Sequence, residues 1–246
     1  MGSEFHLKAF QGQAAAFRAA ALQAGPDAPV STCSGWDVRR MVQHLARVYA
    51  SVRLALETEP DGERPEVPRP PTDFDEAVAW WDDRCAELVT ALSTMEPDRP
   101  VWSFFAGGTP ASWTRRMAHE TAIHRLDAEH ALAGLGPDLV HELIFDPELA
   151  ADGIDEMLDK ILPLGDWSQT QHEGTVLYHA PDAGKAWLVT YRPGERPVTE
   201  SPHGAALEVD ATVAGTADAV YRRVWGRPST AMVTGDAALA SVAAGR

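Results

Sequence analysis

The sequence predicts two domains of different class: an N-terminal four-helix bundle over residues 1–145 and a small α+β domain over residues 146–246. In the first part, apolar residues recur at the spacing of an amphipathic helix. After Gly136 this pattern gives way to short strand-like runs separated by turn residues. Four helices joined by short or moderate connections favour a bundle.

Four helices are expected in the first domain, and their ends carry recognisable signals. A Gly-Pro pair ends the first helix, and Gly134 ends the fourth. The second begins near Ser34, which can cap free backbone N–H groups, and Asp37 follows three residues later as in a capping box. A Pro-rich loop precedes the third helix. The expected helices cover about residues 6–24, 34–57, 73–95 and 110–132.

The second domain mixes helices and strands. One helix starts at Asp146-Pro147, and an Ala-rich helix starts near Asp236. Turn residues such as Pro193-Gly194 separate the strand-like runs between them. The expected elements are helices over about 147–161, 216–225 and from 236, and strands over about 175–179, 186–191 and 206–213.

The chain is acidic, with 36 acidic and 21 basic side chains in 246 residues and a net charge of −15. This excess argues against nucleic-acid binding, because neutralising phosphates requires a basic face. It also argues against docking on anionic membranes. Long-range attraction of an anionic substrate is not expected either, unless a local cationic site overrides the field.

Targeting signals and cysteines bear on location. There is no apolar run long enough for a transmembrane helix and no secretory signal pattern. The two cysteines, Cys33 and Cys85, are too few for a disulfide scaffold or a Cys-rich zinc site. We therefore expect a cytoplasmic protein with free thiols, monomeric or weakly dimeric, that binds neither nucleic acid nor membranes. The alternative of Cys33 as a catalytic nucleophile has no neighbouring histidine to support it.

The fourth helix carries the residues that suggest chemistry. One stripe of this helix comprises Trp113, Met117, Glu120, His124 and Ala131, with Asp127 at its edge. Because the ends of the stripe are apolar, it should face the core, where an unpaired carboxylate is costly. His44 lies on the apolar side of the second helix and could join Glu120 and His124 in a divalent-metal site with an open position. The alternative is a hydrogen-bonded His–Glu pair in the core, with His44 unrelated to it.

Two familiar metal motifs do not apply. His119 and His124 are five residues apart, whereas the zincin motif H-E-x-x-H separates its histidines by four. The paired Glu-x-x-His motif of di-iron bundles is absent, as are a P-loop and a G-x-G-x-x-G sequence.

Several segments resemble a known enzyme family. Ser34–Leu45, SGWDVRRMVQHL, resembles a ligand helix of the DinB-like metal enzymes. Arg116–Arg125, RMAHETAIHR, resembles the second ligand helix of the mycothiol-dependent maleylpyruvate isomerase family. Asp152–Leu158, Trp225–Arg227 and Gly235–Asp236 resemble that family's C-terminal domain, which has a sterol-carrier-like form. The resemblance covers nearly the whole chain in order and implies a DinB-like bundle for the first domain.

The resemblance implies that His44, Glu120 and His124 bind Zn²⁺ or another divalent metal, and that mycothiol is the thiol cosubstrate. A free thiol has a pKa of about 8.5, and coordination to Zn²⁺ deprotonates it. In the family the thiolate adds to a small electrophilic substrate, which leads either to cis–trans isomerisation or to S-transfer. The alternative is a non-enzymatic metal-binding or regulatory protein that retains the DinB-like fold.

The resemblance also implies arginines that hold an anionic substrate. One matches Arg227, and the other, in the loop after the second helix, matches Arg64 or Arg69. The alternative for Arg227 is a cation favoured by the dipole at a helix C-terminus. Because mycothiol carries no carboxylate and the chain is acidic, the overall charge favours a neutral electrophile. Three aromatic residues either line the pocket or fill the core: Trp102, Phe104 and Phe105.

Overall fold

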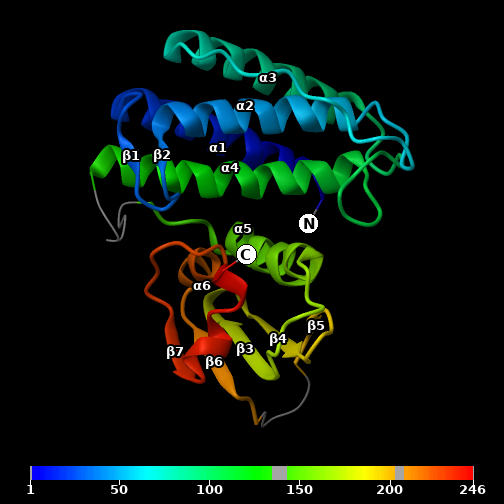
Figure 1. Ribbon diagram of the computed structural model, residues 1–246, viewed down its shortest axis with the longest axis vertical. Helices are drawn as coiled ribbons and strands as arrows, with labels where there is room; N and C mark the ends of the chain where they lie inside the picture. The colour runs from blue at the N-terminus through cyan, green and yellow to red at the C-terminus, as the bar shows by residue number, and fades with distance from the viewer. Residues whose placement is uncertain (1, 135–142, 203–207, 246) are drawn as a thin grey trace. The chain divides into compact units, whose positions relative to one another are not determined.

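The computed structural model describes residues 2–134, 143–202 and 208–245. The chain divides into two compact units, Met1–Val140 and His141–Arg246, each with its own elements (Figure 1). None of the helices in these described ranges is long and apolar enough to cross a membrane.

The first unit is built from four long helices, as the sequence predicts (Figure 1). They are α1 (Ser3–Ala24), α2 (Val38–Ala55), α3 (Phe74–Thr94) and α4 (Pro110–Ala133). Helix α1 packs mainly against α4 and α2 against α3, and α2 also contacts α4. Fully buried side chains fill the centre, among them Phe10, Phe17, Met41, Leu45 and Tyr49.

The observed ends of these helices show which of the expected helix boundaries are correct. Gly134 ends α4 in the left-handed conformation, with φ 63°, as expected. The expected start of α2 is wrong, because Asp37 and not Ser34 is the N-cap and accepts a hydrogen bond from the Arg40 backbone. Trp36 and Asp37 form the short strand β2 (Trp36–Asp37), which pairs with β1 (Pro29–Val30) and delays the helix.

The second unit contains a five-stranded sheet in the order β5-β4-β3-β6-β7, in which only the β3–β6 pair is parallel. Its strands are β3 (Gly174–Ala180), β4 (Lys185–Tyr191), β5 (Val198–Glu200), β6 (Ala211–Ala214) and β7 (Met232–Gly235). The helices α5 (Pro147–Asp155) and α6 (Ala217–Val224) pack against each other, and α6 also contacts β3. The short helix α7 (Ala237–Ala240) follows β7. The predicted α+β class is confirmed.

The strands differ from expectation at the two edges of the sheet. The sequence predicts β3 and β4, whose alternating burial gives a clear period of two. It misses β5 and β7, which are short, largely exposed edge strands without that alternation. The expected strand over 206–213 is observed only from Ala211, and its first two residues lie outside the described part. The expected helix over 147–161 is α-helical only to Asp155 and continues as a π-helical turn over Glu156–Ile161.

Candidate metal centre

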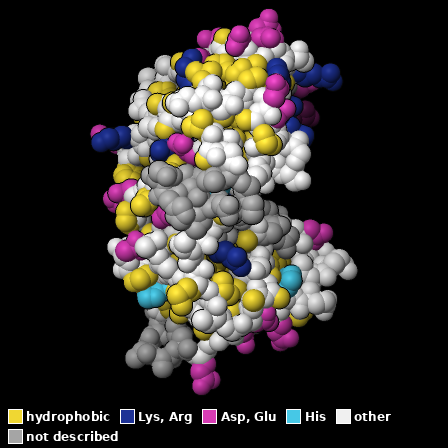
Figure 2. Space-filling model, turned by 90° about the vertical axis from the view of Figure 1, so that its left-hand side faces the viewer, with side chains coloured by type: hydrophobic (Ala, Val, Ile, Leu, Met, Phe, Trp, Pro, Cys, Tyr) yellow, Lys and Arg dark blue, Asp and Glu magenta, His cyan; other side chains and the backbone are white. Residues whose placement is uncertain are grey.

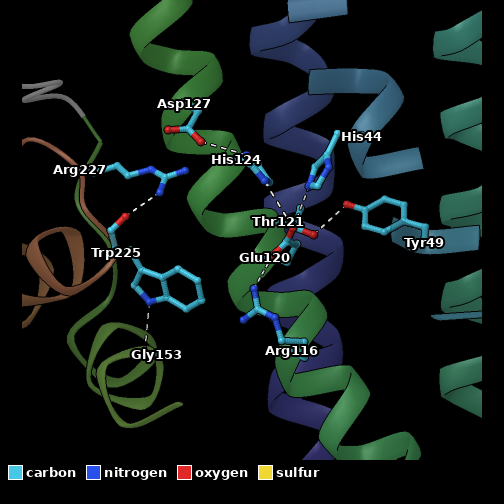
Figure 3. A network of polar contacts seen from close by, with 10 residues as sticks. All are labelled: His44, Tyr49, Arg116, Glu120, Thr121, His124, Asp127, Gly153, Trp225 and Arg227. Atoms are coloured by element: carbon cyan, nitrogen blue, oxygen red, sulfur yellow. Dashed lines mark hydrogen bonds and ion pairs between the residues drawn. The ribbon is translucent and has the colours of Figure 1, made fainter. Parts of the chain in front are cut away.

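Helices α2 and α4 bring the three predicted ligands together (Figure 3). Nε2 of His44 lies 3.1 Å and Nε2 of His124 lies 3.4 Å from the same oxygen, Oε1 of Glu120. The two imidazole rings are 4.9 Å apart. One ligand atom from each side chain therefore points toward a common position.

The placement follows from helical spacing. Glu120 and His124 are four residues apart, so they share one face of α4. His44 lies on α2 between the fully buried Met41 and Leu45, at the side of that helix which approaches α4. The exposed fraction of the side chain is 10% for His124, 18% for Glu120 and 35% for His44. The cluster is therefore open to solvent on the His44 side and closed on the His124 side.

The second carboxylate oxygen of Glu120, Oε2, is ion-paired with Arg116 one helical turn earlier. Burial acts to raise the pKa of Glu120, but the charge of Arg116 and the hydrogen bonds with His124 and His44 outweigh it. The pKa therefore lies well below its ordinary range, and the carboxylate is ionised at neutral pH. Arg116 also fixes the orientation that leaves Oε1 facing the histidines.

The other ring nitrogen of His124, Nδ1, lies 2.9 Å from Oδ2 of Asp127, which is fully buried. Thr32 donates to Oδ1 of Asp127 at 2.5 Å, and the thiol of Cys33 donates to Oδ2 at 3.5 Å. Burial acts to lower the pKa of His124, but the hydrogen bonds and charges of Asp127 and Glu120 raise it to about 9. A carboxylate on the far nitrogen of a histidine is the usual arrangement behind a metal ligand.

Cys33, His124 and Asp127 also lie close enough to form a second ligand cluster. It shares His124 with the first cluster but uses the opposite ring nitrogen. The hydrogen bonds already satisfy the donors and acceptors of this group, so we interpret it as the support of His124. Cys33 thus lies behind the histidine, which gives no support to its alternative role as a nucleophile.

Trp36, in the strand β2 just before α2, packs on both histidines. Its ring is stacked on His124 with centroids 6.0 Å apart and lies 4.9 Å from the ring of His44. On the inner side, Tyr49 of α2 and Thr121 of α4 share a buried hydrogen bond of 2.8 Å (Figure 3). These contacts hold the two ligand helices in register.

A cavity of about 650 Å³ opens beside the cluster and includes His44 and Glu120 in its wall. Of the aromatic residues proposed for this wall, Trp102 and Phe104 line the cavity, whereas Phe105 is not part of its lining and packs against Trp113. Four arginines and Gln43 supply most of the polar lining: Arg40, Arg47, Arg64 and Arg116. Of the two alternatives in the loop, Arg64 lines the cavity and Arg69 does not.

Arg227 belongs to the second unit and follows the end of α6. Its guanidinium donates to the carbonyl oxygen of Trp225 at 2.6 Å (Figure 3). Its backbone N–H donates to the carbonyl oxygen of Arg222. This is the position of a cation at a helix C-terminus, which the sequence left open as the alternative. A role of Arg227 toward a substrate stays a prediction.

The sequence reasoning assigned no supporting role to four residues that shape the centre, although it placed Asp127 at the edge of the ligand stripe. Two of them carried a usable signal, because Arg116 precedes Glu120 by four residues and Asp127 follows His124 by three. Thr32 and Trp36 gave no such signal, since their contacts with α4 span about ninety residues of chain.

Comparisons with known proteins agree on a family. Residues 7–129 match the model of the mycothiol maleylpyruvate isomerase N-terminal domain, and residues 148–241 match that of the MDMPI C-terminal domain. The fold is similar to a crystal structure of the mycothiol-dependent maleylpyruvate isomerase, with TM-score 0.57 and 14% identity, and to that of a histidine-to-alanine mutant, with TM-score 0.62 and 13% identity. Each match covers 95% of this chain and 93% of the other. A search of curated proteins finds no significant match.

Proposed function

Since this chain belongs to the mycothiol maleylpyruvate isomerase family, we propose that it is a metalloenzyme that activates a small thiol, mycothiol, for addition to an electrophile. The observation that carries the proposal is the convergence of His44, Glu120 and His124 at the wall of a cavity. Their outward atoms are already engaged, since Arg116 holds Oε2 of Glu120 and Asp127 holds Nδ1 of His124.

The donor set fits a divalent metal such as Zn²⁺. Two imidazole nitrogens and one carboxylate oxygen are common zinc ligands, and three protein ligands leave a position for an exogenous group. The supported orientation of His124 leaves Nε2 as its ligand atom, as metal-binding histidines require. A bound metal would supply Lewis acidity and lower the pKa of a coordinated thiol.

The protein's own side chains then have distinct tasks. His44, Glu120 and His124 hold the ion, while Arg116 keeps Glu120 ionised and oriented. The cavity receives the thiol and its partner, and the rings of Trp102 and Phe104 form part of its wall.

Isomerisation and S-transfer begin with the same bond, formed between the thiol sulfur and an electrophilic carbon. In isomerisation the adduct loses the thiol again after rotation about the former double bond, and the thiol is recovered. In S-transfer the π bond of the electrophile is broken by the addition, its electron pair takes up a proton, and the resulting thioether adduct is released. The same centre supports either outcome, and the electrophile decides between them.

The proposal is tested by incubating the metal-loaded protein with mycothiol and a panel of electrophiles, with products identified by mass. We expect either a thiol adduct or a cis–trans product with thiol recovered, and loss of both in Glu120→Gln. His179→Ala is the matched control, because His179 is an exposed histidine on the sheet of the other unit. Metal binding without turnover of any electrophile would instead favour a binding or regulatory protein.

A further inference from the structure

The cavity beside the candidate metal centre has one end that is mostly apolar. Helices α2 and α4 run in opposite directions, so residues after His44 and residues before Glu120 lie on the same side of the ligands (Figure 1). At a rise of about 1.5 Å per residue, the apolar residues of this side lie about 5–12 Å from the ligands along the helix axes. The lining residues of α2 and α4 on this side are Arg47, Val48, Ser51, Val52, Trp113, Arg116 and Met117.

The polar side chains of the lining are concentrated near the ligands. On α2, Arg40 and Gln43 precede His44 by four residues and one residue, and Arg47 follows it by three. Arg116 lies further along α4, but its guanidinium is directed toward Glu120, with which it is ion-paired. The part of the cavity beyond this first helical turn is therefore formed mainly by apolar side chains.

The turn before α4 adds two aromatic rings to this end of the cavity, those of Trp102 and Phe104. The backbone N–H of Trp102 donates to the carbonyl oxygen of Thr58, just after α2, at 2.9 Å. Its carbonyl oxygen accepts a hydrogen bond of 2.9 Å from the indole of Trp113 on α4. The ring of Phe104 lies 5.5 Å from that of Trp113 in an edge-on arrangement. The turn is thus fixed to both helices, and its rings form a preformed wall.

Phe104 is unusually exposed for a large apolar side chain, with 52% of its surface accessible. A single exposed phenylalanine is common, but this ring borders a cavity in which a second aromatic ring, that of Trp102, also takes part. A group that packs on both rings would remove apolar surface from water on each partner.

Selection between electrophiles has to come from contacts inside the cavity. Acidic side chains are scattered over the face drawn in Figure 2, in keeping with the net charge of −15. Such a surface gives no long-range attraction that would select one small electrophile over another of the same charge. The feature that can make this distinction is the aromatic end of the cavity.

We infer that this end is a specificity subsite, in which Trp102 and Phe104 contact an aromatic ring carried by the electrophile. Aromatic pairs in offset or edge-on arrangements are favourable beyond the area they bury. The distance from the ligands means that a short spacer joins this ring to the carbon that receives the thiol sulfur. The assignment of the ring to the electrophile rests on the proposed function.

The subsite itself is tested by calorimetric titration of the metal-free full-length protein with butan-2-one and 4-phenylbutan-2-one. These ketones share a carbonyl group and lack a reactive double bond, so neither a metal nor a thiol is needed. We expect 4-phenylbutan-2-one to bind about tenfold or more tightly than butan-2-one, because its ring is buried between the two aromatic side chains.

Variants locate the binding site. Phe104→Ala should weaken the binding of 4-phenylbutan-2-one about fivefold or more, because one wall of the subsite is lost. Leu22→Ala is the matched control and should change binding less than twofold, since Leu22 is a 42% exposed residue of α1 that does not line the cavity. Should Phe104→Ala not fold, Trp102→Leu replaces it, because the hydrogen bonds of Trp102 to Thr58 and Trp113 use only its backbone atoms.

The assignment to the electrophile is tested with hex-3-en-2-one and 6-phenylhex-3-en-2-one, metal-loaded protein and mycothiol. In both enones the thiol sulfur bonds to the β-carbon, the π bond breaks and the α-carbon takes up a proton. The saturated spacer keeps the ring from altering the reactivity of the double bond. We expect the ring to raise kcat/KM about tenfold and Phe104→Ala to remove most of this preference.

The inference is overturned if the two ketones bind equally, if Phe104→Ala and Leu22→Ala have the same effect, or if both enones react with equal kcat/KM. It is also overturned if mycothiol displaces 4-phenylbutan-2-one from the metal-loaded protein, since the thiol would then occupy the aromatic end. The proposed function fails on other results, namely absence of metal or of turnover of any electrophile. Turnover of both enones without a preference for the ring would retain the function and lose the subsite.

Discussion

Glu120 and His124 each use one of their two polar side-chain atoms to contact a neighbouring residue and direct the other atom toward the candidate centre. Arg116 holds one oxygen of Glu120 and leaves the other facing the histidines. Asp127 holds one nitrogen of His124 and leaves the other facing Glu120. This division would orient the side chains for an ion in advance, so the proposed binding would need little rearrangement. Both supporting pairs, Arg116 with Glu120 and His124 with Asp127, lie at helical spacing along α4. They could therefore have been predicted together with the candidate ligands.

Asp127→Asn tests the support of His124. The amide keeps the size of the side chain but loses the negative charge, and we expect metal affinity to fall about 10- to 100-fold. Competition with a chromogenic chelator measures this change. Asp82→Asn serves as the control, because Asp82 forms a surface ion pair with Arg18 on α1. Equal affinities in wild type and Asp127→Asn would show that Asp127 has no such role.

Proton release tests the charge state of His124. Its pKa is raised to about 9, so the metal-free protein carries a proton on His124 at pH 7 that must leave when Nε2 binds an ion. We expect about one proton released per metal at pH 7, and an affinity that increases as the pH rises toward 9. Calorimetry in two buffers of different ionisation enthalpy measures the release. Binding without proton release at pH 7 would contradict this ligand assignment.

The pairing of α2 with α4 creates the centre. Periodicity predicted both helices and the faces that meet, because the apolar stripe of each contains its ligand. The first residue of α2 could not be predicted from local sequence signals. It depends on the pairing of β1 with β2, which joins residues on either side of a turn. Asp27, the partner of Arg39, is likewise outside α2. The sequence therefore predicted the candidate ligands that meet here, but not the arginines of α2 that line the cavity.

The hydrogen bond between Tyr49 and Thr121 tests this helix pairing. Tyr49→Phe leaves a buried threonine hydroxyl with one partner fewer and should lower the free energy of unfolding by roughly 1–3 kcal/mol. The double variant Tyr49→Phe/Thr121→Val removes both partners and should cost less than the sum of the single changes. Urea denaturation measures all three. Strict additivity of the two single changes would show that the pair is not coupled.

At the scale of the whole molecule, the candidate ligands all lie in the first unit, and the second unit forms a separate sheet domain. Composition predicted the acidic net charge but not its local reversal in the cavity, because that depends on which arginines lack partners in the folded chain. The edge strands β5 and β7 of the second unit were missed for a related reason. They are strands because they pair with β4 and β6, and their own sequences carry no clear strand pattern.

Metal binding should therefore stabilise the two units unequally. At a free metal concentration 100 times the dissociation constant, the linked stabilisation is about 2.7 kcal/mol. Hydrogen exchange followed by mass spectrometry should show slower exchange in peptides from α2 and α4. Peptides from β3 and β4 serve as the internal control and should change little. Slowing confined to the sheet would place the metal elsewhere.

The central claim, a metal held by His44, Glu120 and His124, is tested most directly by metal content per chain. The account predicts about one divalent ion in protein prepared without chelator, and its loss in both His44→Ala and His124→Ala, while His179→Ala keeps it. Wild-type protein that binds no divalent ion, or full metal content in both ligand variants, would contradict the account.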